Sequence, residues 1–223
     1  MIRVVNVGAR GSKLSLIQTW LAIAAFNVVS PDSETPIKII QTAGDKDQIN
    51  KYKVIGQKGI FARAIEEELM VKNIDLAIHS YKDLGSEIPE GLIVIPVGKR
   101  DDPRDAFISR LGLKLMDMPK GAKIGTSSGR RGGLVKSLRP DFEIVPLRGN
   151  VDTRLLKAQT EEYDGIILAA TGMIRMGLAS QITEYLDLEV ITPPPIKRTG
   201  FLASEINLAA FLICPGWPKR VGL

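Results

Sequence analysis

An alternation of short apolar runs with amphipathic stretches constrains the fold of this chain more than any other feature. Apolar runs of strand length recur, and between them apolar residues return at helical spacing. Strands that alternate with helices build an α/β sheet whose faces are covered by the helices. Ser12 is placed to cap the first helix, which we expect to bury the face that carries Leu14, Ile17, Leu21 and Ala25. In this part of the chain we expect strands at residues 3–7, 37–41, 75–79 and 92–97, and helices at 12–28 and 59–71.

A charged segment interrupts this alternation. Residues 99–105 consist of six charged residues and one proline, a composition typical of linkers. A proline run at 193–195 forms a second break. Between the breaks we expect strands at residues 106–109, 123–125, 143–146 and 164–169, and helices at 128–138 and 150–159. The pattern predicts two α/β lobes, the first made of residues 1–98 plus about 196–213 and the second of residues 104–192, with a tail at 214–223.

The residue counts exclude several classes of site. The chain has one cysteine and one histidine among 223 residues, which excludes an internal disulfide, a cysteine-cluster metal site and a multi-histidine metal centre. Residues 1–10 lack the apolar run and cleavage site of a secretory signal, and no apolar stretch approaches the roughly 18 residues of a membrane span. We therefore expect a cytoplasmic protein with no metal and no membrane partner.

The positive charge is concentrated in one part of the sequence. The formal net charge is +5, and residues 120–157 alone hold nine Lys and Arg against three Asp and Glu. A nucleic-acid surface would interleave basic residues with aromatic ones for stacking, whereas this stretch contains one aromatic residue, Phe142. We therefore expect a small anionic ligand and no nucleic acid.

Arginines recur where an expected strand passes into an expected helix. Thr126, Ser127, Ser128, Arg130 and Arg131 form one such turn, Arg148 and Arg154 flank a second, and Arg10 and Ser12 form a third. A helix start offers unpaired N–H groups to an anion, and arginine adds bidentate contacts to carboxylate or phosphate. The carboxyl ends of strands line the ligand crevice of open α/β sheets, so these turns are candidates for one cleft. The alternative interpretation is a set of ordinary capped helices with arginines facing solvent.

Lys82 and Asp83 follow another expected strand of the first lobe. A carboxylate among cations stays ionised, and it is able to stabilise a developing positive charge or to move a proton. The alternative is a surface turn formed by the pair. His79, which ends the apolar strand, is expected to be a structural histidine.

Taken in order, these residues resemble the porphobilinogen deaminase (hydroxymethylbilane synthase) family. Each motif is weak alone, and the ordered set through residues 3–180 is specific. The motifs are Ala9-Arg10-Gly11-Ser12, Thr42 with Gly44-Asp45, Lys58-Gly59-Ile60-Phe61, His79-Ser80-Tyr81-Lys82-Asp83, Asp102-Pro103-Arg104-Asp105-Ala106-Phe107, Gly125-Thr126-Ser127-Ser128-Gly129-Arg130-Arg131, Leu147-Arg148-Gly149-Asn150-Val151, Thr153-Arg154-Leu155, Tyr163-Asp164 and Gly172 to Leu178 with Arg175.

The resemblance implies a fold, a reaction and a set of roles. The family's first two domains resemble type 2 periplasmic binding proteins, with mixed sheets, helices on both faces and a cleft between the lobes. Its members are transferases of porphyrin and haem biosynthesis that join four porphobilinogens into the tetrapyrrole hydroxymethylbilane with loss of ammonia. Asp83 matches the catalytic aspartate, which contacts pyrrole N–H groups and stabilises a cationic azafulvene. The carboxylate arms of the pyrroles would be held by Arg10, Ser12, Lys82, Thr126, Ser127, Ser128, Arg130, Arg131, Arg148, Arg154 and Arg175.

One feature of the family is not found in this sequence. The family's third domain carries a cysteine, in a Gly-Cys-x-x-Pro-x-Gly loop, that anchors a covalent dipyrromethane cofactor. The surroundings of Cys214 do not match that loop, so we expect a truncated chain with no third domain and no covalent cofactor. Three explanations stay open. The third domain would be supplied by a separate chain, or the protein would be a non-catalytic module that binds pyrrole carboxylates or other small polycarboxylates. Alternatively, the chain would be active by another route, for instance with the cofactor held non-covalently.

Overall fold

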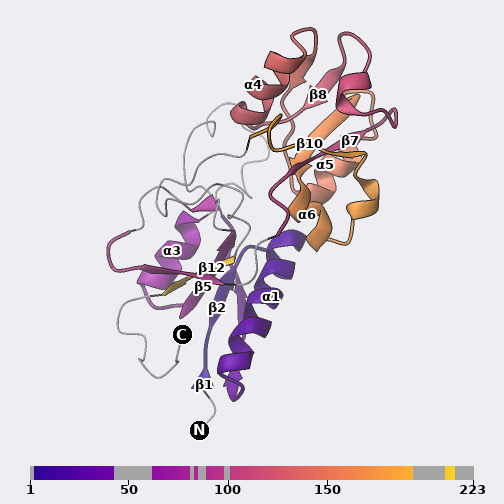
Figure 1. The fold of residues 1–223 in the computed structure, drawn as a ribbon. Helices are drawn as coiled ribbons and strands as arrows, with labels where there is room; N and C mark the ends of the chain where they lie inside the picture. Colours follow the sequence, from indigo (N-terminus) through magenta and orange to yellow (C-terminus); the bar gives the residue numbers. More distant parts are fainter. Residues whose placement is uncertain are drawn as a thin grey trace. The chain divides into compact units, whose positions relative to one another are not determined.

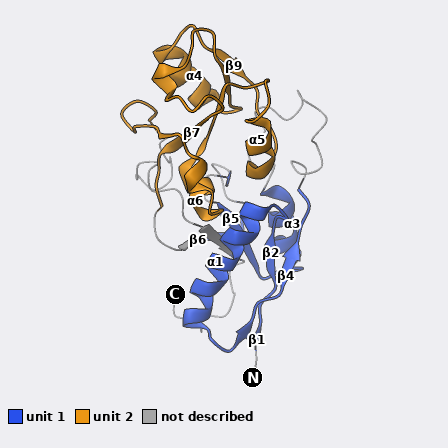
Figure 2. Ribbon diagram, turned by 90° about the vertical axis from the view of Figure 1, so that its right-hand side faces the viewer, with its two compact units in different colours: residues 1–100, 206–223 blue, residues 101–205 orange. Residues whose placement is uncertain are grey.

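The chain folds into two compact units. A computed structural model describes residues 3–42, 62–80, 83–84, 89–97, 101–192 and 209–213. Unit 1 comprises residues 1–100 and 206–223, and unit 2 comprises residues 101–205 (Figure 2). Unit 2 is therefore inserted into the sequence of unit 1.

Unit 1 contains a five-stranded mixed sheet with the strand order β4-β2-β5-β12-β6. β2 is parallel to both β4 and β5, whereas β12 is antiparallel to β5 and β6. β12 comes from the far end of the described sequence, and it lies between two strands of the first hundred residues. The elements of unit 1 are β1 (Arg3–Val4), β2 (Val7–Ala9), α1 (Lys13–Val29), β3 (Ser33–Glu34), β4 (Ile37–Ile39), α3 (Arg63–Met70), β5 (Leu76–Ser80), β6 (Ile93–Val97) and β12 (Ala209–Ile213).

Alternation along β5 decides which helix covers which face of this sheet. Leu76 and Ile78 pack in a core cluster with α1, whereas Ala77 points to the opposite face and packs with α3. Figure 1 shows the two helices on either side of the strands. Both faces of the sheet are thus buried, as the alternation of strands and helices predicts.

The buried face of α1 is not the one expected from the sequence. The helix begins after Ser12, as predicted, but Leu21 is 55% exposed. The buried side chains are instead Gln18, Thr19, Ala22, Ile23 and Phe26. Because apolar residues surround this helix, their spacing does not identify the face that packs on the sheet.

Unit 2 contains a second five-stranded mixed sheet with the order β11-β7-β10-β8-β9. β10, β8 and β9 are parallel, and β7 runs antiparallel to β10, with Asp105 opposite Ala169. The start of β7 therefore lies at the same edge as the carboxyl ends of the parallel strands. The elements of unit 2 are β7 (Asp105–Ser109), η2 (Leu115–Asp117), β8 (Lys123–Gly125), α4 (Gly129–Leu138), β9 (Glu143–Val145), α5 (Val151–Lys157), β10 (Gly165–Ala169), α6 (Ala170–Arg175), η3 (Ala179–Gln181) and β11 (Glu184–Tyr185).

Helices cover both faces of the unit 2 sheet as well. Ile166 and Leu168 of β10 pack with side chains of α5 and α6, whereas Ile167 between them packs with Val135 of α4. The expected α/β class, with mixed sheets and helices on both faces, is confirmed in each unit. The composition of residues 99–105 predicts a linker. This prediction is wrong for the last residue of the segment, because Asp105 is a buried residue of β7.

Candidate functional site

Hydroxyl side chains shape the turn between β8 and α4. Ser128 is the N-cap of α4, and its Oγ accepts a hydrogen bond from the backbone N–H of Arg131 at 3.4 Å. Thr126 Oγ1 accepts from the N–H of Ser128 at 3.2 Å, and Ser127 Oγ donates to the carbonyl of Leu147 at 2.6 Å. The last bond joins this turn to the segment that follows β9. The hydroxyls predicted to contact a ligand therefore also fix the start of α4.

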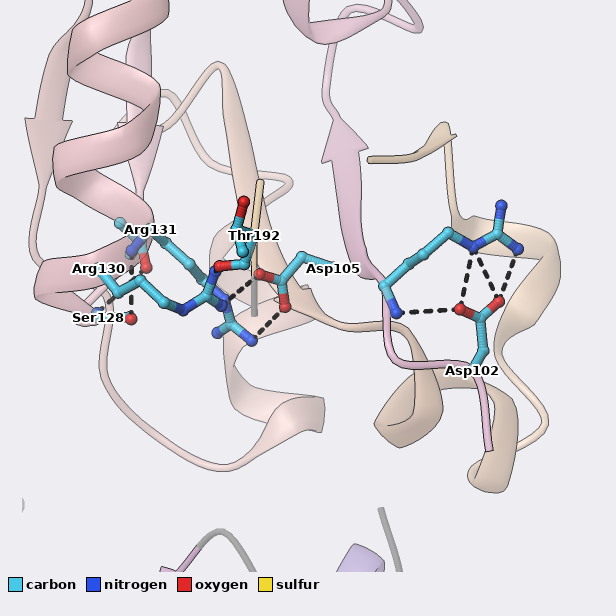
Figure 3. A network of polar contacts seen from close by, with 8 residues as sticks. Asp102, Asp105, Ser128, Arg130, Arg131 and Thr192 are labelled. Carbon is cyan, nitrogen blue, oxygen red and sulfur yellow. Dashed lines mark hydrogen bonds and ion pairs between the residues drawn. The ribbon is translucent and has the colours of Figure 1, made fainter. Parts of the chain in front are cut away.

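One buried carboxylate holds the two adjacent arginines of this turn. Asp105 Oδ2 accepts from Nη2 of Arg130 and Asp105 Oδ1 from Nη2 of Arg131, each at 2.6 Å. Figure 3 shows both guanidinium groups on one side of the Asp105 carboxylate, each facing one of its oxygens. The Asp105 side chain is 6% exposed, against 25% for Arg130 and 15% for Arg131. Burial of this kind strengthens the ion pairs and makes the removal of either partner costly.

A second aspartate of the same segment holds Arg175. Asp101 Oδ2 accepts from Nε of Arg175 at 2.7 Å and from the hydroxyl of Thr171 at 3.0 Å. Both donors belong to α6, which follows β10. Neither Asp101 nor Asp105 is predicted from the sequence as part of the candidate site. The signal available was their spacing of four residues, in a charged run that leads directly into an apolar strand.

Arg148 and Arg154 lie at the next turn, between β9 and α5. Gly149 has a φ of 114°, which favours glycine, and its carbonyl accepts from Arg154 Nε at 2.7 Å. Burial lowers the pKa of Arg154, and the neighbouring charges of Arg131 and Arg148 lower it further. The guanidinium groups of Arg131 and Arg148 therefore lie close enough to Arg154 to repel its charge.

These arginines are only partly neutralised by the protein. Among the described residues, no carboxylate forms an ion pair with Arg148 or Arg154. The carboxyl edge of the unit 2 sheet thus carries unbalanced positive charge beside donors that are already oriented. Such an edge is suited to bind a small anion with more than one carboxylate or phosphate group.

The candidate residues of unit 1 lie at the carboxyl ends of two adjacent parallel strands. Arg10 follows β2, and Ser12 Oγ accepts from the N–H of Ser15 at 3.3 Å at the start of α1. Asp83 follows β5 and is half-buried. Because β2 and β5 are parallel neighbours, the segments with Arg10 and Asp83 leave the same edge of the sheet. Lys82 lies outside the described residues, and a cleft shared with unit 2 stays a prediction.

His79 is buried close to this edge. It is 5% exposed, and its Nε2 atom has no hydrogen-bond partner in the described part of the chain. Burial, together with the charge of Arg10, lowers the pKa of His79 from 6.5 to about 4. The imidazole is therefore neutral at pH 7.

The described residues contain no candidate metal cluster and no candidate membrane span. Within them, no three acidic, histidine or cysteine side chains gather in a way that could hold a metal ion. No described helix has both the length and the apolar character needed to cross a bilayer. The cytoplasmic location and the absence of nucleic-acid and membrane partners stay predictions.

The sequence is similar to one protein family over most of its length. Residues 5–209 match the family described as "Porphobilinogen deaminase, dipyromethane cofactor binding domain". Porphobilinogen deaminase of Deinococcus deserti is 43% identical over 207 residues, which cover 92% of this chain and 66% of the relative. The enzyme of Staphylococcus carnosus is 46% identical over 193 residues, or 86% of this chain and 63% of the relative. The chain thus spans somewhat less than two thirds of the length of these relatives.

The fold has solved counterparts at low sequence identity. A lipoprotein from Actinomyces odontolyticus matches with a TM-score of 0.55 and 12% identity, covering 99% of this chain and 87% of the other. An amino-acid ABC transporter extracellular-binding protein from Bacillus subtilis matches with a TM-score of 0.52 and 10% identity, covering 97% and 86% of the two chains. These matches confirm the expected likeness to the fold of periplasmic binding proteins.

Proposed function

The chain belongs to the porphobilinogen deaminase family, and we propose on that premise that it acts on porphobilinogen in tetrapyrrole biosynthesis. The reaction is the joining of four porphobilinogens into hydroxymethylbilane with loss of ammonia. The observation that carries the proposal is the partly neutralised arginine edge of unit 2. Each added pyrrole brings an acetate and a propionate arm, and Arg148 and Arg154 lack a carboxylate partner among the described residues.

Asp83 is the proposed catalytic residue. Its carboxylate would contact the pyrrole N–H groups, stabilise the cationic azafulvene that remains after ammonia leaves, and assist proton transfer. Arg10 and Ser12 leave the same sheet edge as Asp83 and would hold a carboxylate arm there. Lys82 has the same proposed role.

The proposed cofactor is dipyrromethane, for whose binding the matching family model is named. Dipyrromethane supplies the primer to which pyrroles are added. Its carboxylates fit the donor set of the unit 2 edge. There Asp105 joins Arg130 to Arg131, Arg131 and Arg148 lie near Arg154, and the hydroxyls of the α4 turn are adjacent. Arg175 is held separately by Asp101. Cys214 lies outside the described residues, and its sequence context differs from the family's attachment loop. We therefore propose non-covalent binding of this cofactor by the arginines.

Turnover and binding are tested separately. Porphobilinogen is added to the purified chain, ammonia is measured, and the product is examined for cyclisation to uroporphyrin. Asp83→Asn should abolish turnover and leave porphobilinogen binding nearly unchanged. The Asn oxygen can still accept from a pyrrole N–H, whereas the negative charge is needed for the cation that develops only during the reaction. Asp32→Asn changes an exposed aspartate of the same unit and should alter neither. Binding without turnover in the parent chain would favour the non-catalytic module.

A partner chain is tested in the same assay. Addition of the separately produced C-terminal third of the Deinococcus deserti relative should raise turnover if a third domain can be supplied by a second chain. Mass spectrometry of the chain after incubation would detect a dipyrromethane adduct on Cys214. An adduct would refute non-covalent binding of the cofactor.

A further inference from the structure

The arrangement of Arg130, Arg131 and Asp105 is unusual for adjacent residues of a helix. Consecutive residues of an α-helix are rotated by about 100° from each other, so their side chains normally diverge. Here the Nη2 atoms of both arginines converge on the two oxygens of one carboxylate, each at 2.6 Å. Asp105 therefore overrides the helical divergence and brings two guanidinium groups together.

Asp105 uses only one nitrogen of each guanidinium. Arg130 Nη1 donates to the carbonyl of Thr192 at 2.8 Å, which holds that group from a second side. Arg131 Nε is buried and has no partner among the described residues. An unpaired buried donor is costly, and a ligand that accepted from it would remove that cost. The arginines are thus held in place with part of their hydrogen-bonding capacity unused.

We propose that Asp105 is a positioning residue, which orients Arg130 and Arg131 to receive a carboxylate of the ligand. The proposal rests on the proposed function, because it takes pyrrole carboxylates as the ligand. A positioning role means that Asp105 raises the affinity for the ligand, whereas charge repulsion alone would mean that Asp105 lowers it. A negative charge beside an anion site weakens binding, so its neutralisation should tighten binding if charge alone decides. The sign of the change in affinity therefore separates positioning from repulsion.

The test is the affinity of the parent chain and of Asp105→Asn for porphobilinogen, measured by calorimetry. Asp105→Asn keeps the shape of the side chain and removes its charge. Loss of the oriented pair should weaken binding about tenfold or more, the range expected when hydrogen bonds to charged groups are lost. Asp105→Glu should recover part of the affinity. Asp102→Asn is the matched control, because Asp102 pairs with Arg104 at 2.6 Å and forms no ion pair with Arg130 or Arg131 among the described residues.

Thermal unfolding of each variant separates positioning from a purely structural role. A variant that unfolds at a lower temperature but binds with the parent's affinity when folded would overturn the proposal. Tighter binding by Asp105→Asn would also overturn it, because Asp105 would then compete with the ligand for the arginines.

If the parent chain does not bind porphobilinogen, the proposed function is refuted. The positioning role of Asp105 can still be tested by a measurement that needs no ligand. Modification by phenylglyoxal, mapped by mass spectrometry, reports how firmly each arginine is held. Asp105→Asn should raise the modification rates of Arg130 and Arg131 severalfold and leave that of Arg139 unchanged, because Arg139 pairs with Asp141. Unchanged rates at Arg130 and Arg131 would overturn the positioning role.

Discussion

The buried histidine of unit 1 makes stability depend on pH in a way that can be calculated. The pKa of His79 is lowered from 6.5 to about 4 in the folded chain, mainly by burial. The unfolded chain therefore binds a proton at a higher pH than the folded chain does. The stabilisation is complete above pH 6.5, and it is lost progressively as the pH falls toward 4.

The size of the loss follows from the two pKa values. Between pH 7.5 and pH 5 the unfolding free energy of unit 1 should fall by about 2 kcal/mol on account of His79 alone, and by about 3 kcal/mol at pH 4. His79→Leu replaces the imidazole with an apolar side chain of similar size and should remove this contribution. Since His79 is the one histidine of the chain, no other group with an ordinary pKa near 6.5 is changed.

Urea denaturation at a series of pH values, followed by tryptophan fluorescence, measures the effect. Trp20 lies on α1 of unit 1, and residues 101–205 of unit 2 contain no tryptophan, so the signal reports unit 1. The quantity compared is the difference in unfolding free energy between the parent chain and His79→Leu at each pH, in which shared carboxylate titrations cancel. Parallel curves between pH 7.5 and pH 5 would refute the reasoning. So would an imidazole NMR signal that titrates near pH 6.5.

Three substitutions in unit 2 are expected to change its free energy of unfolding, which urea denaturation followed by circular dichroism measures. Gly133→Ala should raise the unfolding free energy by about 1 kcal/mol, because the added Cβ meets no atom within 4 Å in a helix interior; a lower midpoint would contradict this. Gly165→Ala should lower it by about 1–3 kcal/mol, because the Cβ would lie 2.4 Å from the ring of Phe107; an unchanged midpoint would contradict the packing. Ser128→Ala should lower it by about 1 kcal/mol through loss of the cap on Arg131 N–H, and equal stability would show the cap to be dispensable.

Local signals in the sequence predicted the helix starts well. The sequence predicts that Ser12 caps one helix and that another begins at Ser128, and each serine is the N-cap of the helix that follows it. A hydroxyl side chain before an amphipathic stretch acts within one turn of the chain, so its effect does not depend on the rest of the fold. The expected class of both units follows from the same kind of local pattern.

Contacts between distant segments could not be predicted in this way. Asp105 pairs with arginines 25 and 26 residues later, and Asp101 pairs with Arg175, 74 residues later. Those pairs depend on the register of β7 against β10, which no local pattern specifies. For this reason a run of charges that is typical of a linker became part of the candidate site. The buried face of α1 was mistaken for a related reason, since only the packed sheet distinguishes one apolar face from another.

The place of β12 in the sheet has a consequence for folding during synthesis on the ribosome. β5 and β6 each pair with β12, whose residues 209–213 are synthesised after every described residue of unit 2. All described strands of unit 2 are therefore available to fold before the sheet of unit 1 can close. During that interval the edges of β5 and β6 that later pair with β12 are open to other strands, and unpaired edges of this kind promote aggregation. The nascent chain is thus exposed to aggregation through these strand edges between the emergence of β6 and the emergence of β12.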